Sequence, residues 1–239
     1  MKNVLLLAAF AAVSLSSSAQ NDKIIRDDHA QRREVKGFHA IRISGGIDLY
    51  LSQGEEAVAV SASDVDVRDR IKTEVENGVL KVYMDTDGWH WGSHGNKKLK
   101  AYISFKQLDA LGASGGSDVY IENGIRTDKL DLNLSGGSDL KGKMTIGELS
   151  IVQTGGSDIY LGGEAAKLSV HASGGSDFHG YDLVSGECRV EASGGSDVQI
   201  TANKELSVNA SGGSDVNYKG QALLKDHHAS GSSDITKKG

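Results

Sequence analysis

Ser114-Gly115-Gly116-Ser117-Asp118 (SGGSD) opens a series of seven closely related motifs in the second half of the chain. The other six lie at 135–139, 154–158, 173–177, 193–197, 211–215 and 230–234. Their aspartates are separated by 21, 19, 19, 20, 18 and 19 residues, and a more distant relative, SGGID, lies upstream at 44–48. Self-similarity at a nearly constant period is typical of proteins built from stacked repeats.

Apolar and polar residues alternate on both sides of each motif. The residue directly after each aspartate is apolar: Val119, Leu140, Ile159, Phe178, Val198, Val216 and Ile235. A second apolar column lies three residues before the motif: Leu111, Leu132, Ile151, Val170, Val190 and Val208. A third lies five residues before it: Leu130, Leu149, Leu168, Cys188 and Leu206. A period of two predicts strands with one buried face.

Each repeat therefore predicts a strand, a glycine corner, a second strand and a looser corner. Paired glycines permit the positive φ that a tight corner needs. One repeat cannot bury its apolar side alone, whereas stacked repeats bury all of them. We expect an all-β, parallel β-helix or solenoid with SGGSD corners and rungs of about 19 residues. The usual crossover preference predicts a right-handed solenoid.

The chain divides into four predicted segments. Residues 1–19 have a positive Lys2, an apolar stretch over 4–13 and a small-residue cleavage site, as a signal peptide does. An N-terminal segment covers 20–34, an irregular β part covers 35–110, and the regular solenoid with its cap covers 111–239. No later stretch predicts a transmembrane helix. We expect export to the periplasm, the outer cell surface or the medium.

Composition narrows the possible partners and the chemistry. The formal net charge is −6, and the basic residues do not cluster into a stripe, so a nucleic-acid partner is not expected. Cys188 is the only cysteine, which excludes an intramolecular disulfide. Because Cys188 occupies a leucine position of the repeat, we predict a buried, unreactive side chain.

Irregular features mark both ends of the solenoid. Residues 64–71 could form a short helix, with Asp64 as its N-cap. In the last repeat, Lys225 and His227 are aligned with inward leucine and valine, which suggests a polar cap that closes the core. His227 and the adjacent His228 are a weak metal candidate, because neighbours on a strand point to opposite faces.

In-register stacking would place seven aspartates in one column: Asp118, Asp139, Asp158, Asp177, Asp197, Asp215 and Asp234. Neighbouring carboxylates about 4.8 Å apart repel by roughly 1 kcal/mol in water and roughly 3 kcal/mol at a protein surface. Hydrogen bonds within each corner would offset this repulsion. A row of calcium ions is the alternative, although one aspartate per rung supplies few of the six to eight oxygens that calcium takes.

A polar loop carries the second candidate site. Trp89, His90 and Trp91 lie in the glycine-rich stretch GWHWGSHG at 88–95. Exposed indoles there could stack on a sugar or hold a protein, or they could pack over an open end of the solenoid. The preceding Asp85-Thr86-Asp87-Gly88 is explained by a simple turn, because it lacks the other ligands of a calcium loop.

Three stretches together resemble a known family. They are Phe38–Leu51 (FHAIRISGGIDLYL), the strand Leu80-Lys81-Val82 and the serial SGGSD corners. The resemblance is to exported Bacteroidetes-type proteins called putative autotransporter adhesin, head GIN domain. It implies a right-handed β-helix and adhesion at the cell surface, and it supplies no catalytic residues. The sequence shows no heptad stalk, so a free-standing head-like solenoid is expected.

The leading functional hypothesis is therefore a non-enzymatic, adhesin-like surface protein that binds protein or glycan. Outward residues beside the corners, including Tyr120, Lys141, Tyr160, His179 and Gln199, would form its surface. A polysaccharide-active enzyme is an alternative, although the repeated carboxylates form no unique acid and base pair. A structural envelope protein, with calcium-stabilised corners or with copies associated through a rung end, is a third possibility. No cofactor is expected beyond that possible calcium.

Overall fold

The computed structural model describes residues 27–88 and 98–239. The predicted signal peptide and the predicted ligand-binding residues Trp89, His90 and Trp91 lie outside the described residues. Within the described part of the chain, no helix has the length and apolar character needed to cross a membrane.

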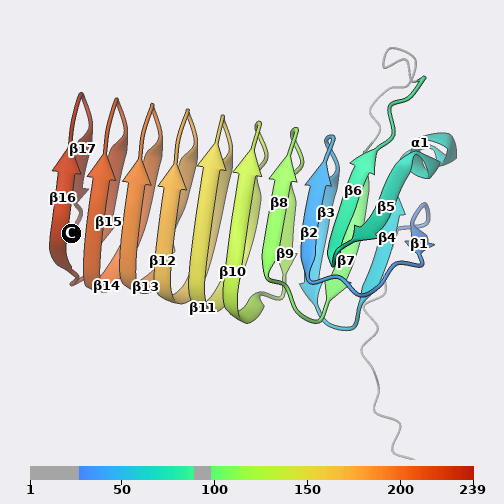
Figure 1. The fold of residues 1–239 in the computed structure, drawn as a ribbon, viewed down its shortest axis with the longest axis horizontal. Helices are drawn as coiled ribbons and strands as arrows, with labels where there is room; N and C mark the ends of the chain where they lie inside the picture. The colour runs from blue at the N-terminus through green and yellow to red at the C-terminus, as the bar shows by residue number, and fades with distance from the viewer. Residues whose placement is uncertain (1–26, 89–97) are drawn as a thin grey trace, which may run out of the picture.

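The protein is a parallel β-solenoid of about seven turns (Figure 1). The N-terminal strands are β1 (Gln31–Arg33), β2 (Ala40–Ser44), β3 (Asp48–Gln53), β4 (Ala57–Ser61), β5 (Ile71–Glu76), β6 (Val79–Met84), β7 (Lys100–Phe105), β8 (Ala110–Ser114) and β9 (Val119–Glu122). The remaining strands are β10 (Ile125–Ser135), β11 (Leu140–Thr154), β12 (Asp158–Ala172), β13 (Asp177–Ala192), β14 (Asp197–Ala210), β15 (Asp215–Lys219), β16 (Leu223–Ala229) and β17 (Asp234–Lys237). A short helix, α1 (Val65–Asp69), lies between β4 and β5.

The regular half has the register that the repeat predicts. Leu130 pairs with Leu149, Leu149 with Leu168, and Leu168 with Cys188 on successive parallel strands. Strands β11 to β14 each run from one SGGSD corner to the next and bend around the opposite edge of the solenoid (Figure 1). The predicted all-β solenoid with rungs of about 19 residues is confirmed.

The solenoid has two outer faces. We call the sheet that contains β6, β2, β8, β16 and the C-terminal halves of β10 to β14 the front face. The back face contains β7, β3, β9, β15, β17 and the N-terminal halves of β11 to β14. The SGGSD corners join the two faces as the narrow loops at the upper edge in Figure 1.

The chain does not begin at one end of the stack. Strand β2 lies between β6 and β8, and β3 lies between β7 and β9. The SGGID corner at 44–48 therefore stacks directly on the first SGGSD corner. The backbone N–H of Ile47 donates to Ser117 Oγ at 3.1 Å, across 70 residues of sequence.

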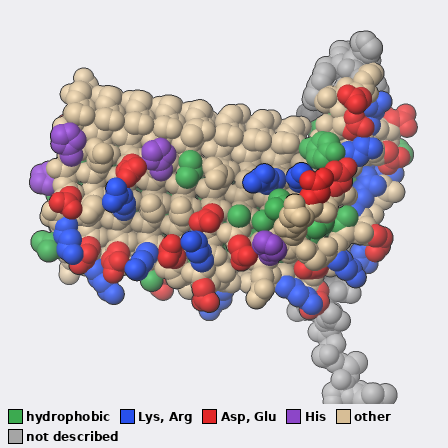
Figure 2. Space-filling model, viewed as in Figure 1, with side chains coloured by type: hydrophobic (Ala, Val, Ile, Leu, Met, Phe, Trp, Pro, Cys, Tyr) green, Lys and Arg blue, Asp and Glu red, His purple; other side chains and the backbone are tan. Residues whose placement is uncertain are grey.

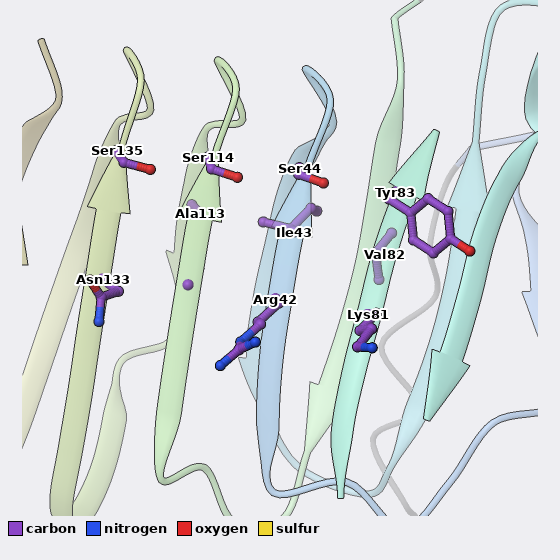
Figure 3. A pocket seen from close by; sticks show the side chains of 11 residues that line it. Arg42, Ile43, Ser44, Lys81, Val82, Tyr83, Ala113, Ser114, Asn133 and Ser135 are labelled. Atoms are coloured by element: carbon purple, nitrogen blue, oxygen red, sulfur yellow. The ribbon is translucent and has the colours of Figure 1, made fainter. Parts of the chain in front are cut away.

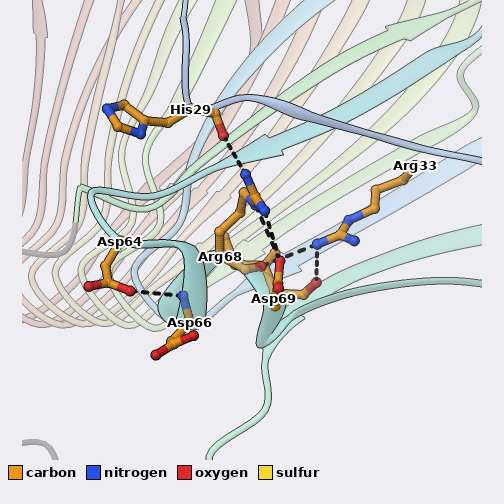
Figure 4. Close-up of polar contacts among 7 residues, drawn as sticks. His29, Arg33, Asp64, Asp66, Arg68 and Asp69 are labelled. Carbon is orange, nitrogen blue, oxygen red and sulfur yellow. Dashed lines mark hydrogen bonds and ion pairs between the residues drawn. The ribbon is translucent and has the colours of Figure 1, made fainter.

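Antiparallel strands close the N-terminal end of the stack. Strand β5 pairs with β6, β4 pairs with β7, and β1 pairs with β4. Helix α1 confirms the predicted N-cap, because Asp64 Oδ1 accepts a hydrogen bond from the backbone N–H of Asp66 at 2.8 Å (Figure 4). Arg33 Nη2 donates to the carbonyl oxygens of Arg68 at 3.2 Å and Ile71 at 3.5 Å, which ties β1 to the end of this helix.

The last rung differs from the expectation at one residue. A register shift between Leu206 and Ser207 places Leu224, and not Lys225, opposite Leu206. Because of this shift Lys225 is exposed, and its Nζ lies 2.7 Å from Glu205 Oε2. His227 does lie opposite Val208, as predicted. The irregularity keeps Leu224 packed against the core while the charged group of Lys225 stays in water.

Inward side chains form one continuous core along the axis. It contains stacked aliphatic columns together with Phe105 and Phe178, both fully buried. Cys188 is 5% exposed, and burial raises the pKa of its thiol to about 12. The thiol is therefore neutral at physiological pH, and the prediction of a buried side chain is confirmed.

The two glycines of one corner should differ sharply in their tolerance of a side chain. Gly174 has φ +81°, and a Cβ there would lie 2.8 Å from the carbonyl oxygen of Gly155. A Cβ on Gly175 would meet nothing closer than 3.9 Å, and its φ is not positive. We expect Gly174→Ala to lower the free energy of unfolding by about 2 kcal/mol or more. Gly175→Ala, the matched control, should change it by less than about 0.5 kcal/mol.

Urea unfolding of the two variants measures this difference. Equal and small effects would mean that the corner can rearrange without the close contact between neighbouring rungs.

Candidate functional site

The second serine of each motif points into the solenoid and is buried. Ser117, Ser138, Ser157, Ser176, Ser196 and Ser214 are 0% exposed. In the C-terminal corners this hydroxyl donates across its own turn, as Ser196 Oγ does to the carbonyl oxygen of Ser193 at 3.0 Å, and Ser196 Oγ also lies 3.2 Å from the carbonyl oxygen of Ala172 in the neighbouring rung. In the N-terminal corners it accepts from the neighbouring rung, as Ser138 Oγ does from the backbone N–H of Ser117 at 3.1 Å. These serines belong to the scaffold.

The corners adopt two conformations along the stack. Both glycines have positive φ at Gly45-Gly46, Gly115-Gly116 and Gly136-Gly137, whereas only the first does from Gly155 onward. In the second form, backbone groups of neighbouring corners bond directly, as in Gly195 N to Gly174 O at 2.7 Å.

Buried Gln153 lies beside the first corner of the second form. Its Nε2 donates to the carbonyl oxygens of Ser157 and Asp177, each at 3.0 Å. The side-chain amide therefore connects the backbone of two neighbouring rungs inside the solenoid.

The predicted aspartate column is present. Asp158, Asp177, Asp197, Asp215 and Asp234 are register partners on successive strands. The hydrogen bonds to these carboxylates run between rungs and not within one corner: Asp118 Oδ1 accepts from Asp139 N at 3.3 Å. Asp139 Oδ1 accepts from Asp158 N at 3.2 Å in the same way. Charge–dipole bonds of this kind offset part of the repulsion.

Burial and the remaining repulsion raise the pKa of two aspartates of the column. Partial burial, and then the neighbouring carboxylates of Asp139 and Asp177, raise the pKa of Asp158 above its ordinary value. Burial and its two aspartate neighbours raise the pKa of Asp197 in the same direction. Ionisation of these two carboxylates therefore carries a net electrostatic cost. Calcium binding by these aspartates stays a prediction.

Aromatic residues recur in a second column on the back face, most of them two residues after an aspartate of a corner motif. The Tyr50 ring stacks between Tyr102 and Tyr120, with centroids 5.2 and 5.3 Å away. Further along, Tyr160 stacks on His179 at 4.3 Å, and Lys141 Nζ lies 5.0 Å from the Tyr160 centroid. Because the rings cover one another's faces, this column offers a ligand mainly ring edges and hydroxyl groups.

The front face contains a groove that sequence reasoning missed. We call it the Arg42 groove; its volume is about 410 Å³ and it extends over β6, β2, β8 and β10 (Figure 3). Its outward side chains form two in-register rows, Lys81, Arg42, Gly112 and Asn133 in one and Tyr83, Ser44, Ser114 and Ser135 in the other. Gly112 contributes no side chain, so the first row is interrupted between Arg42 and Asn133.

The charged groups of the groove differ in their pairing. Lys81 forms an ion pair with Glu76, and the Tyr83 hydroxyl donates to Glu74 at 3.2 Å. Within residues 27–88 and 98–239, the Arg42 guanidinium has neither an ion-pair nor a hydrogen-bond partner. The groove therefore contains one cation whose hydrogen-bonding capacity is unused.

A family match covers most of the chain. Residues 37–222 match the family described as "Putative auto-transporter adhesin, head GIN domain". This chain belongs to that family. No protein of curated function matches it.

The solenoid of this GIN-domain protein resembles several crystal structures. A putative adhesin from Bacteroides fragilis NCTC 9343 has a TM-score of 0.75 and 22% identity, covering 87% of this chain and 94% of the other. A putative adhesin from Parabacteroides distasonis ATCC 8503 has a TM-score of 0.68 and 18% identity, covering 87% and 96%. A putative lipid binding protein from the same strain has a TM-score of 0.63 and 20% identity, covering 89% and 98%. At these identities the likeness shows the shared fold.

The buried serines of the GIN-domain corners should contribute more to the free energy of unfolding than the outward serines do. Ser196→Ala removes the donor to two carbonyl oxygens inside the solenoid, and we expect it to lower the free energy of unfolding by about 1–2 kcal/mol. Ser193→Ala, in the same corner, removes a side chain whose hydroxyl has no hydrogen bond within the described residues and should be nearly neutral. Equal losses in chemical denaturation would contradict the assigned role of the inward hydroxyl.

Neutralising a carboxylate of the aspartate column should stabilise the folded protein. Because the folded-state pKa of Asp158 is raised, its ionised form destabilises the fold at neutral pH, and this cost disappears as pH falls through the folded pKa. In chelator at low salt and pH 7, Asp158→Asn should raise the free energy of unfolding by about 0.5–1 kcal/mol. The gain should shrink at about pH 3 and in about 1 M salt.

Asp131→Asn, at an exposed position of β10, is the control for this measurement. A loss of stability in Asp158→Asn would contradict net repulsion within the column. The same unfolding series with calcium tests the cation hypothesis, because bound calcium would stabilise the wild type but not an Asp158→Asn/Asp177→Asn variant.

Proposed function

We propose that this GIN-domain protein is an exported, non-catalytic, adhesin-like protein that binds glycan or protein at the cell surface. The observation that carries the proposal is the in-register array of outward side chains on two extended faces. Such an array presents many shallow contacts along one axis, which suits attachment to an extended partner. Membership of a family named for adhesins supports the same function.

The placement of the acidic groups supports a role without catalysis. Glycoside hydrolysis in most families needs two carboxyl groups with different roles on opposite sides of one bond. In this solenoid the motif aspartates repeat in a single line. The carboxylates of Asp118 and Asp139 each accept a hydrogen bond from a backbone N–H group of the next rung. These carboxylates are used by the scaffold.

Export and surface presentation are part of the proposal. The predicted signal peptide supports passage through the inner membrane, and the family description supports a position at the cell surface. A free-standing solenoid would reach the surface by association with another envelope component or would be released.

Bead adhesion under flow tests this function. Beads coated with the purified protein should be retained on surfaces carrying bacterial polysaccharide or glycoprotein, and soluble protein should compete for the same sites. Beads coated with heat-denatured protein are the control for non-specific attachment. Retention no greater than this control on every surface would overturn the proposal.

A second readout separates adhesion from the enzymatic alternative. The same polysaccharides are incubated with the protein, and new reducing ends and unsaturated products are measured. Product formation that scales with protein concentration would instead support a polysaccharide-active enzyme.

A further inference from the structure

We propose that the Arg42 groove binds an oxyanion-bearing sugar residue of an acidic polysaccharide, with Arg42 contacting the carboxylate or sulfate group. This inference rests on the proposed surface-binding function and names the ligand class and the site. It concerns the front face, away from the stacked aromatic rings of the back face.

The position of Arg42 is determined by its neighbours on β8 and β6. Arg42 pairs in register with Gly112 on one side and with Lys81 on the other. A Cβ placed on Gly112 would lie 3.6 Å from Arg42 Cγ, so the arginine stem lies beside the space that a side chain would otherwise fill. In Figure 3 the guanidinium extends from β2 toward β8.

One cation of the groove is available to an oxyanion. Glu76 forms an ion pair with Lys81, whereas the Glu74 carboxylate accepts a hydrogen bond from Tyr83 and keeps its charge, so the attraction comes from direct contact with Arg42. Arg42 is left with five N–H donors in a planar fork, a geometry that matches carboxylate and other oxyanions. The net charge of the whole chain is −6, so general attraction of a polyanion is disfavoured and binding depends on this one residue.

The rest of the groove offers groups that match sugar hydroxyls. Ser44 and Ser114 are register partners, Ser135 continues the row on β10, and all three side chains project from the front face in Figure 3. Within the described residues, neither these hydroxyls nor the Asn133 amide makes a side-chain hydrogen bond. Hydroxyl and amide groups both donate and accept, as sugar hydroxyls do.

The size and lining of the groove also fit a saccharide. A volume of about 410 Å³ lies within the range of about 300–1,000 Å³ found for small-molecule sites. The outward groups are polar, which favours a sugar over a lipid chain. The space-filling view shows the front face as an open surface, on which an extended polymer can lie across several rungs (Figure 2).

Three variants of the full chain test the site. Arg42→Gln removes the charge and keeps most of the side-chain length. Gly112→Val fills the gap in the row; a Cβ at this position makes only ordinary contacts of 3.6–4.0 Å, so the variant should fold. Arg189→Gln is the matched control, because Arg189 is an outward arginine on the same face, several rungs away, that pairs with Glu191.

Binding is measured with four defined probes at low ionic strength. They are oligogalacturonate, its neutral methyl ester, dextran sulfate and phosphatidylglycerol vesicles. We expect saturable binding of oligogalacturonate or dextran sulfate, the better probe identifying the anionic group, and no saturable binding of the methyl ester. Arg42→Gln and Gly112→Val should each weaken the acidic-saccharide affinity by about tenfold or more, whereas Arg189→Gln should change it less than about twofold.

Thermal unfolding of each variant separates loss of the site from loss of the fold. If the beads adhere but Arg42→Gln and Gly112→Val bind acidic saccharide as the wild type does, the groove assignment is wrong and the adhesive function stands. Equal binding of the methyl ester, or saturable binding of vesicles alone, would also overturn the assignment. If neither the beads nor the probes bind, the proposed function fails together with the site.

Discussion

Parallel hydrogen bonding between neighbouring rungs is the constraint on which the rest of the structure depends. Each strand of the regular half pairs with the equivalent strand one repeat later, so the same motif position recurs at one place in every rung. A one-residue slip would move the buried leucines of a rung to the solvent side. Close contact between neighbouring corners adds to this constraint. A side chain on Gly174, for example, would collide with the backbone of Gly155 in the neighbouring rung.

Stacking of like residues has opposite consequences for different residue types. Aliphatic columns gain burial, and inward serines close the polar corners through hydrogen bonds such as Ser196 to Ser193. Tyrosine rings gain contact with one another along the back face. Aspartates gain only bonds to backbone N–H groups and retain some repulsion, since the pKa of Asp158 is raised by burial and by its neighbours.

The Arg42 groove arises where the regular order of the chain is broken. Strand β2 inserts between β6 and β8, which brings Arg42 beside Gly112 although about seventy residues separate them. The only sequence signal was the glycine in the outward position of Leu111-Gly112-Ala113, where other repeats carry larger residues such as Asn133 or His171. That signal shows a missing side chain but not which residue lies next to it.

The repeat period, the apolar columns and the corner motif determined the solenoid, the burial of Cys188 and the aspartate column. These are local, periodic properties, and parallel pairing copies them from rung to rung. Tertiary structure alone decided that the SGGID corner stacks on Ser114–Asp118 and that Leu224 replaces Lys225 in the last inward column. Each of these depends on contacts between distant segments or on a single register shift, and neither leaves a periodic pattern in the sequence.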